Sequence, residues 1–136
     1  MNAALRNIAD LAGRLLLAAL FLIAGFGKLG AYAGTQAYMA SSGVPGALLP
    51  LVIALELGGG GLILAGLWTR AAALALAAFS VLAAAIFHAN FADQMQQILF
   101  LSDVAIAGGF LLLAANGAGA WSVDARRARK SNGGAS

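Results

Sequence analysis

The ionisable residues best placed for chemistry in this sequence lie within or beside long apolar segments. Lys28, Glu56, His88 and Asp103 each belong to a different segment of this kind. A charged group inside an apolar span is costly, and it usually faces the protein interior, where it meets an opposite charge, a proton or a ligand. Two carboxylates with an amine and an imidazole form a set that can exchange protons or hold a small polar molecule.

The elements that must position these groups are four apolar runs in a chain of 136 residues. Hydrophobic residues make up 62% of the chain and charged residues only 10%, whereas a soluble domain has about 25% charged residues. Each run is close to the ~20 residues that a helix needs to cross a hydrocarbon core of ~30 Å. The sequence therefore predicts an all-α integral membrane four-helix bundle with spans at 11–28, 48–67, 71–87 and 98–115.

The depths of the two carboxylates place them in the same half of this predicted bundle. At ~1.5 Å per helical residue, Glu56 lies about 12 Å along the second span and Asp103 about 8 Å along the fourth, from the same side. Lys28 ends the first span on that side, and His88 follows the third. We therefore predict one polar cluster of these four groups with Asn90 beside it. Glu56 and Asp103 are the candidate catalytic groups, and Lys28, His88 and Asn90 are the candidate ligand-binding groups.

Two other interpretations of the same residues differ in chemistry. One is an internal ion-pair network that only fixes how the helices pair. The other is a metal site, which is not predicted because the spacing of His88, Glu56 and Asp103 is not typical of metal ligands. The chain has one histidine and no cysteine, which excludes dithiol chemistry and, within one chain, a bis-histidine haem.

The basic residues predict the orientation in the membrane. With four spans, the two termini and the connection between the second and third spans share one side. That side carries seven of the eight basic residues, and the other carries only Lys28. Positive charge favours the cytoplasmic side, so both termini are predicted to be cytoplasmic. The seven residues are Arg6, Arg14, Arg70, Arg126, Arg127, Arg129 and Lys130.

The same charges bear on partners and on domain organisation. The absence of a basic face outside the tail argues against nucleic acid and leaves the lipid bilayer as the expected partner. Residues 1–125 are predicted to form one membrane domain, and residues 126–136 a basic, disordered cytoplasmic tail. A signal peptide ending at Ala31-Tyr32-Ala33 is the alternative for the first span, and Arg14 and Lys28 argue against it.

Further residues are assigned structural roles. Asp10 and Arg14 are four residues apart and are predicted to pair on one helix face. The glycine run Gly58, Gly59, Gly60 and Gly61 predicts close approach of a neighbouring helix, with Ala54/Gly58 and Gly61/Ala65 as small pairs inside the bundle. A loosened helix beside a cavity is the alternative, and it also places this face inside. Gly59 and Gly60 share the face of Glu56.

The connection between the first two spans is predicted to contain a short interfacial helix over the mouth of the bundle. Thr35 is a candidate cap for this helix, Gly43 a candidate end, and Pro45 prevents its continuation. An irregular loop is the alternative. Asp93 is a candidate cap for the helix of the fourth span.

Several motifs along nearly the whole chain resemble the DoxX family of small bacterial inner-membrane proteins, in particular its YqjF-like branch. Some are glycine-rich and lie within or beside the predicted spans. The segments that carry the resemblance are Arg14 with Phe26-Gly27-Lys28, Tyr32-Ala33-Gly34-Thr35-Gln36, Gly43-Val44-Pro45-Gly46, Glu56-Leu57-Gly58-Gly59-Gly60 leading to Thr69-Arg70, Phe87-His88-Ala89-Asn90-Phe91, Gly108-Gly109-Phe110-Leu111-Leu112-Leu113 and Trp121-Ser122-Val123-Asp124.

The resemblance implies a four-helix protein of the bacterial inner membrane and a quinone-linked, quinol oxidase-type oxidoreductase subunit. No residue of this chain carries electrons by itself, so such a role needs a non-covalently bound quinone or a partner oxidoreductase subunit. Ser102-Asp103 stands where relatives often have Lys-Asn, which makes the predicted cluster more acidic here. The alternative is a non-enzymatic membrane protein that assembles with or supports other proteins, and a homo-oligomer is the other expected assembly. A small-molecule permease is less favoured, because four spans enclose little aqueous volume.

Overall fold

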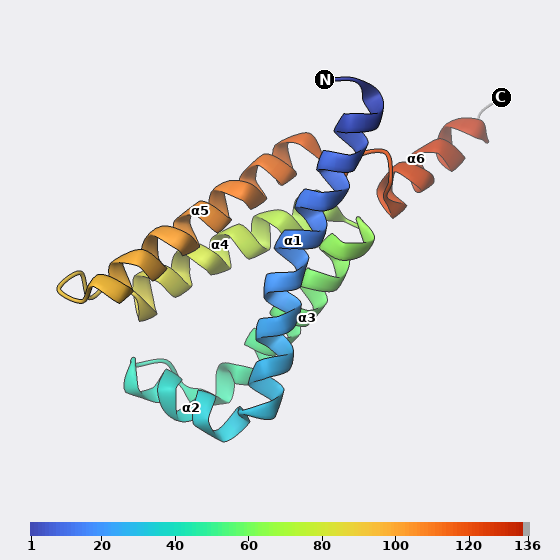
Figure 1. The fold of residues 1–136 in the computed structure, drawn as a ribbon. Coiled ribbons are helices and arrows are strands. Elements are labelled where there is room, and N and C mark those ends of the chain that lie inside the picture. Colours follow the sequence, from blue (N-terminus) through green and yellow to red (C-terminus); the bar gives the residue numbers. More distant parts are fainter. Residues whose placement is uncertain (135–136) are drawn as a thin grey trace.

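The computed structural model describes residues 1–134, and every regular element among them is helical. Four helical segments are long and apolar enough to cross a membrane, and they confirm the predicted four-span, all-α architecture. They are α1, α3 with the turn before it, α4 and α5. The elements are α1 (Ala3–Gly30), α2 (Tyr32–Ser41), the 3-10 turn η1 (Gly46–Leu48), α3 (Leu49–Ala65), α4 (Thr69–Phe87), α5 (Gln94–Asn116) and α6 (Val123–Gly133) (Figure 1).

The helices extend beyond the apolar runs because polar residues cap them. The Asn2 side chain accepts a hydrogen bond from the Leu5 N–H at 2.9 Å, so α1 begins eight residues before the predicted start of the span at residue 11. Asp93 accepts a hydrogen bond from the Met95 N–H at 2.9 Å and starts α5. This confirms the predicted cap. Such caps satisfy backbone donors that have no partner within the helix.

The four spans pack as two antiparallel pairs. Helix α1 lies along α3, and α4 lies along α5, while α3 and α4 contact one another over a shorter length. The pairs meet near α6 and the N-terminus and diverge toward α2 (Figure 1). A core of small and aromatic side chains joins them. In it, the rings of Phe21 and Phe110 pack edge to face with centroids 5.4 Å apart, and Ala18, Ile63 and Leu76 are fully buried.

The α2 helix links the two pairs where they diverge, and it confirms the predicted helix between the first two spans. Met39 of α2 is buried in a second cluster with Leu49 and Ile53. The ring of Tyr38 stacks on Phe87 at the end of α4, with centroids 5.4 Å apart. Thr35 does not cap α2, because its hydroxyl donates to the Ala31 carbonyl at 2.8 Å instead.

The glycine run of α3 is divided between two faces. A Cβ at Gly59 would lie 3.0 Å from Leu76 of α4, and one at Gly60 would lie 3.1 Å from Leu22 of α1. These two glycines therefore permit close helix contact, as predicted.

The expectation that the other small residues of α3 also face inward is wrong. A Cβ at Gly58 or Gly61 would meet nothing within 4 Å, and Ala54 and Ala65 are exposed. The reason is helical geometry. Positions 56, 59, 60 and 63 form one stripe at three- and four-residue spacing, and that stripe is the buried one. Positions 54, 58, 61 and 65 form a different stripe of the same helix.

The tail predicted to be disordered from residue 126 is helical as far as Gly133. The Ser122 hydroxyl accepts a hydrogen bond from the Ala125 N–H at 3.1 Å, and Asp124 lies in the first turn. Both features stabilise a helix N-terminus, and they override the polar composition on which the prediction of disorder rested. Residues 135–136 lie outside the described part of the chain.

Candidate functional site

An ion pair between α1 and α3 lies at the depth predicted for the polar cluster. Lys28 Nζ is 2.8 Å from Glu56 Oε1 and 3.1 Å from Oε2. The Glu56 side chain is only 3% exposed, whereas that of Lys28 is 28% exposed. Glu56 shares its stripe with Gly59 and Gly60, so the thin part of α3 allows α1 and α4 to come close beside the carboxylate.

A second pair joins α4 to α5. His88 Nε2 is 3.6 Å from Asp103 Oδ2, and each side chain is about a quarter exposed. The distance exceeds that of a good hydrogen bond, and Asp103 Oδ2 is buried with no hydrogen-bond partner within the described residues. The pair is therefore looser than the one between Lys28 and Glu56.

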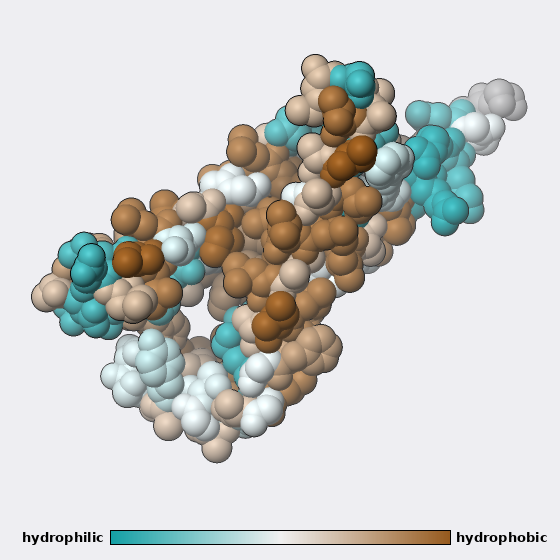
Figure 2. Space-filling view, in the orientation of Figure 1, coloured by the Kyte–Doolittle hydropathy of each residue, from teal (hydrophilic) through white to brown (hydrophobic). Residues whose placement is uncertain are grey.

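The predicted cluster is divided between the two helix pairs. Within residues 1–134, no hydrogen bond or salt bridge joins Lys28 or Glu56 to His88 or Asp103. Asn90 lies in the turn after α4, where its side-chain oxygen accepts from the Ala92 N–H at 3.3 Å. Figure 2 shows an opening between the two helix pairs on the α2 side, with hydrophilic surface on part of its wall.

Arg14 occupies a buried position at the other end of the molecule, the α6 end. It is 2% exposed. Its guanidinium donates to the carbonyls of Ile63 at 3.1 Å and Leu64 at 2.9 Å, near the end of α3. It also donates to the carbonyls of Ala118 at 3.0 Å and Trp121 at 2.8 Å, between α5 and α6. One side chain thus ties together α1, the end of α3 and the α5–α6 connection.

The predicted ion pair of Arg14 with Asp10 is wrong, although the assignment of Arg14 to a structural role agrees with its contacts. Among the described residues, Arg14 makes no salt bridge. The carbonyls in the last turn of a helix lack intrahelical partners, and a guanidinium presents five donors in a planar fork. Four tertiary carbonyls therefore take the place of the neighbouring carboxylate.

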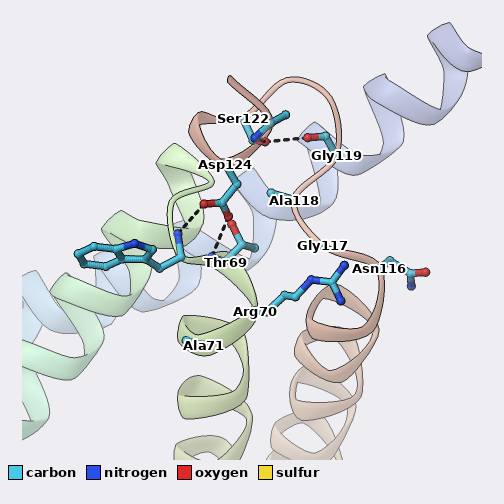
Figure 3. A pocket seen from close by; sticks show the side chains of 11 residues that line it. Thr69, Arg70, Ala71, Asn116, Gly117, Ala118, Gly119, Ser122 and Asp124 are labelled. Carbon is cyan, nitrogen blue, oxygen red and sulfur yellow. Dashed lines mark hydrogen bonds between the residues drawn. The ribbon is translucent and has the colours of Figure 1, made fainter. Parts of the chain in front are cut away.

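Asp124 connects α6 to the start of α4 (Figure 3). Its carboxylate accepts from the backbone N–H groups of Trp68 at 2.9 Å and Thr69 at 3.0 Å. Its own N–H donates to the Gly66 carbonyl at 2.8 Å. Gly66 adopts a left-handed conformation with φ 69°, and a Cβ there would lie 2.5 Å from that of Ser122. The turn between α3 and α4 therefore requires glycine.

The charge of Asp124 makes this connection sensitive to acid. Burial raises the pKa of Asp124. The hydrogen bonds from Thr69 and Trp68 and the positive charge of Arg127 lower it by a larger amount, so the pKa of Asp124 lies below its ordinary value. A lowered folded-state pKa stabilises the protein above the unfolded value of about 3.9, and this contribution disappears as the pH falls through the folded value.

We expect Asp124→Asn to destabilise the protein by about 1 kcal/mol at neutral pH, because the amide has one acceptor oxygen and leaves the N–H of Trp68 or Thr69 without its partner. The variant should also lose less stability than the wild type between neutral pH and strong acid, because it has no charge to lose. Thermal unfolding in detergent across that pH range measures both effects. Parallel pH profiles for the two proteins would contradict the assignment, since every other carboxyl group is common to both.

Two pockets lie at the α6 end, where the sequence predicts no site. The larger has a volume of about 510 Å³ and is lined by Trp68, Thr69, Arg70, Asn116 and Asp124, among others (Figure 3). The smaller, of about 350 Å³, includes Trp121, Arg126 and Arg129. In the sequence, both pockets are marked by a tryptophan a few residues before an arginine, beside a membrane span. This pattern usually indicates membrane topology and does not by itself predict a binding site. Within residues 1–134, no group of three His, Cys, Asp or Glu residues is arranged to hold a metal ion.

The four apolar helices and the ion pairs between them define a small, helical, multi-pass membrane protein. The DoxX family model matches residues 9–89. The chain is 51% identical over 120 residues to the inner membrane protein YqjF of Escherichia coli (strain K12), covering 88% of this chain and 92% of that protein. It is 37% identical over 131 residues to the inner membrane protein YphA of the same organism, covering 90% and 93%. No solved structure gives a significant match.

The chain therefore belongs to the DoxX family, as its motifs indicate. It is a multi-pass protein of the inner membrane.

Proposed function

We propose that this protein is a quinone-linked membrane subunit that holds a quinone beside Lys28 and Glu56. The observation that carries the proposal is a nearly fully buried carboxylate, paired with one lysine, inside a membrane-spanning helix. Intramembrane ionisable groups of this kind typically mark ligand or proton pathways. A bound quinone would supply the redox centre that the side chains of this chain do not provide.

The residues present fit the polar head of such a molecule. A lysine ammonium has three donors, and Glu56 accepts two of those of Lys28, which leaves one for a ligand oxygen. The 28% exposure of Lys28 makes this donor accessible from outside the pair. The Glu56 carboxylate can accept a proton or a hydrogen bond from a hydroxyl group. His88 and Asp103 belong to the other helix pair and are not part of this proposed quinone site.

We expect the purified protein to bind a ubiquinone analogue saturably and Glu56→Gln to weaken this binding at least about tenfold. The magnitude follows from the loss of a charged hydrogen-bonding group, worth about 1.5–3 kcal/mol. Asp103→Asn is the matched control, because it neutralises a carboxylate of the separate pair. It should change the affinity less than about twofold. Absence of saturable binding to the wild type, or equal affinity in Glu56→Gln, would contradict the proposal.

A second candidate function is assembly with other membrane proteins or with further copies of this chain. The specific observation is the outward stripe of α3, where Gly58 and Gly61 have open space beside them. Small residues at such spacing let a neighbouring helix approach closely.

If this stripe is a contact surface, Gly58→Leu with Gly61→Leu should abolish a crosslinked complex that the wild type forms in native membranes. Gly108→Leu is the control, because a Cβ at that α5 glycine also meets nothing within 4 Å. It should leave the complex intact. Persistence of the complex in the double variant would exclude the stripe as the contact.

A further inference from the structure

The smaller pocket at the α6 end has the composition of a site for an anion at a membrane surface. It lies between the end of α3, at Ala65, and the start of α6. Arg126 and Arg129 line it from α6, and Trp121 and Ser122 from the preceding connection. Arg126 and Arg129 are three residues apart, so they lie on one face of the helix.

The two arginines of this pocket have no internal partner. Both are exposed, and neither side chain makes a hydrogen bond or a salt bridge within residues 1–134. None of the pocket-lining residues in this described range is acidic. The nearest acidic residue in sequence, Asp124, is directed to the backbone of Trp68 and Thr69. Two guanidinium groups without an internal partner in the described part of the chain therefore line an open surface pocket whose walls carry no acidic residue.

The walls of the pocket are held in place by the buried contacts at this end. Arg14 donates to the carbonyls of Leu64, beside Ala65, and of Trp121. The Asp124 N–H bonds to Gly66 and fixes the start of α6 against the end of α3. The pocket is thus formed by three chain segments that one buried arginine and one backbone contact hold together. Such preorganisation lowers the entropy lost on binding.

The surroundings of the pocket distinguish a lipid from a soluble anion. Trp121 is 50% exposed and Leu64, in the last turn of α3, is 44% exposed. Tryptophan concentrates at membrane interfaces, and an exposed leucine at the end of a span offers apolar surface for an acyl chain. Basic pockets at the ends of membrane helices bind the head groups of anionic lipids.

We propose that this pocket binds the phosphate of one anionic phospholipid, with Arg126 and Arg129 as its ligands and Trp121 at the lipid interface. The site lies at the opposite end of the spans from Lys28 and Glu56, so it is independent of the proposed quinone site.

Native mass spectrometry of the full-length protein in detergent with added phosphatidylglycerol tests this site. The wild type should retain one phosphatidylglycerol in preference to phosphatidylcholine. Arg126→Gln with Arg129→Gln should weaken that binding about a hundredfold, because each guanidinium loses a charge-assisted hydrogen bond to the phosphate. Arg127→Gln with Lys130→Gln is the matched control. It removes the same charge from the same helix but leaves the pocket lining unchanged, and it should weaken binding less than about threefold.

Three outcomes would overturn the proposal. Equal losses in the two double variants would mean that only the overall charge of α6 attracts lipid. Unchanged binding in Arg126→Gln with Arg129→Gln would place the lipid elsewhere. Displacement of the bound lipid by millimolar inorganic phosphate would assign the pocket to a soluble anion. Circular dichroism of each variant checks that α6 and the spans remain helical.

Discussion

Replacing Arg14 with methionine should lower the free energy of unfolding by about 4 kcal/mol or more, the largest effect that we expect from a single substitution. Arg14 makes four hydrogen bonds to backbone carbonyls, and hydrogen bonds to charged groups contribute about 1.5–3 kcal/mol each. Methionine keeps the apolar stem but removes the guanidinium donor from all four carbonyls, and among the described residues the Ile63 carbonyl keeps only the Gly66 N–H at 3.2 Å. The α6 end should open, because α3 and the α5–α6 connection lose their common partner. Unfolding by a graded change of detergent measures the loss.

Arg14→Lys is the informative control for this prediction. It retains the positive charge, but an ammonium is a compact group that lacks the planar fork of a guanidinium. It should therefore lose stability to an intermediate degree. Equal stabilities of Arg14→Lys and the wild type would mean that charge alone matters at this position. An Arg14→Met variant as stable as the wild type would contradict the structural role.

Replacing Lys28 with methionine should destabilise the protein by about 3 kcal/mol, the second largest effect. Removing one partner of a buried ion pair costs about 3–5 kcal/mol, because the remaining charge is left without compensation. We expect the lower part of this range, since Lys28 is 28% exposed while Glu56 is 3% exposed. The same unfolding assay measures the effect.

Replacing Asp103 with asparagine should destabilise the protein by less than about 1 kcal/mol. The distance between Asp103 and His88 is longer than that between Lys28 and Glu56, and each side chain is about a quarter exposed.

The double variant Lys28→Met with Glu56→Met tests whether the two side chains stabilise the protein through their interaction with each other. Replacing both charges with apolar groups of similar size is often close to neutral, so the double variant should recover most of the stability lost in Lys28→Met. A double variant with the summed loss of both single variants would show that the two side chains do not interact. Recovery would also provide a folded protein without the ion pair.

The number and type of the membrane helices could be predicted from sequence, whereas the pairing of the helices could not. Apolar runs of about span length define helices by composition alone. The division of the polar cluster depends instead on which helices are neighbours, and the depths of Glu56 and Asp103 carry no such information. The depths predicted one cluster of all four groups, whereas the structure pairs Lys28 with Glu56 and His88 with Asp103. Depth could not show that the two helix pairs diverge (Figure 1).

The four-residue spacing predicted the wrong partner for Arg14, because carbonyl groups distant in sequence bind its side chain instead. Asp10 and Arg14 satisfy the four-residue rule for helix pairs, but the carbonyls of Ile63 and Leu64 are about 50 residues away in sequence and offer better geometry. The stripe of Glu56, Gly59 and Gly60 was identifiable from helical spacing. The neighbouring small residues were assigned to the same interior because composition does not distinguish a helix contact from an open surface.

The contacts and pockets at the α6 end could not be predicted, because each of its residues taken alone has a common role that indicates no site. Ser122, Asp124 and the following arginines are polar, and polar tails are often disordered. Their cap and the contact of Asp124 with the start of α4 become visible only when α6 is placed beside the α3–α4 turn. The pocket of Arg126 and Arg129 likewise needs Ala65 from a helix that precedes them by about 60 residues.

The most direct test of a quinone beside Lys28 and Glu56 is a mass-spectrometric survey of lipophilic molecules that remain bound after mild detergent extraction from native membranes. The wild type and the Lys28→Met with Glu56→Met variant are compared at equal amounts of folded protein. We predict that a quinone is retained by the wild type in near-stoichiometric amount and is absent from the double variant. Retention of no quinone by the wild type, or of equal amounts by both proteins, would contradict the proposed site.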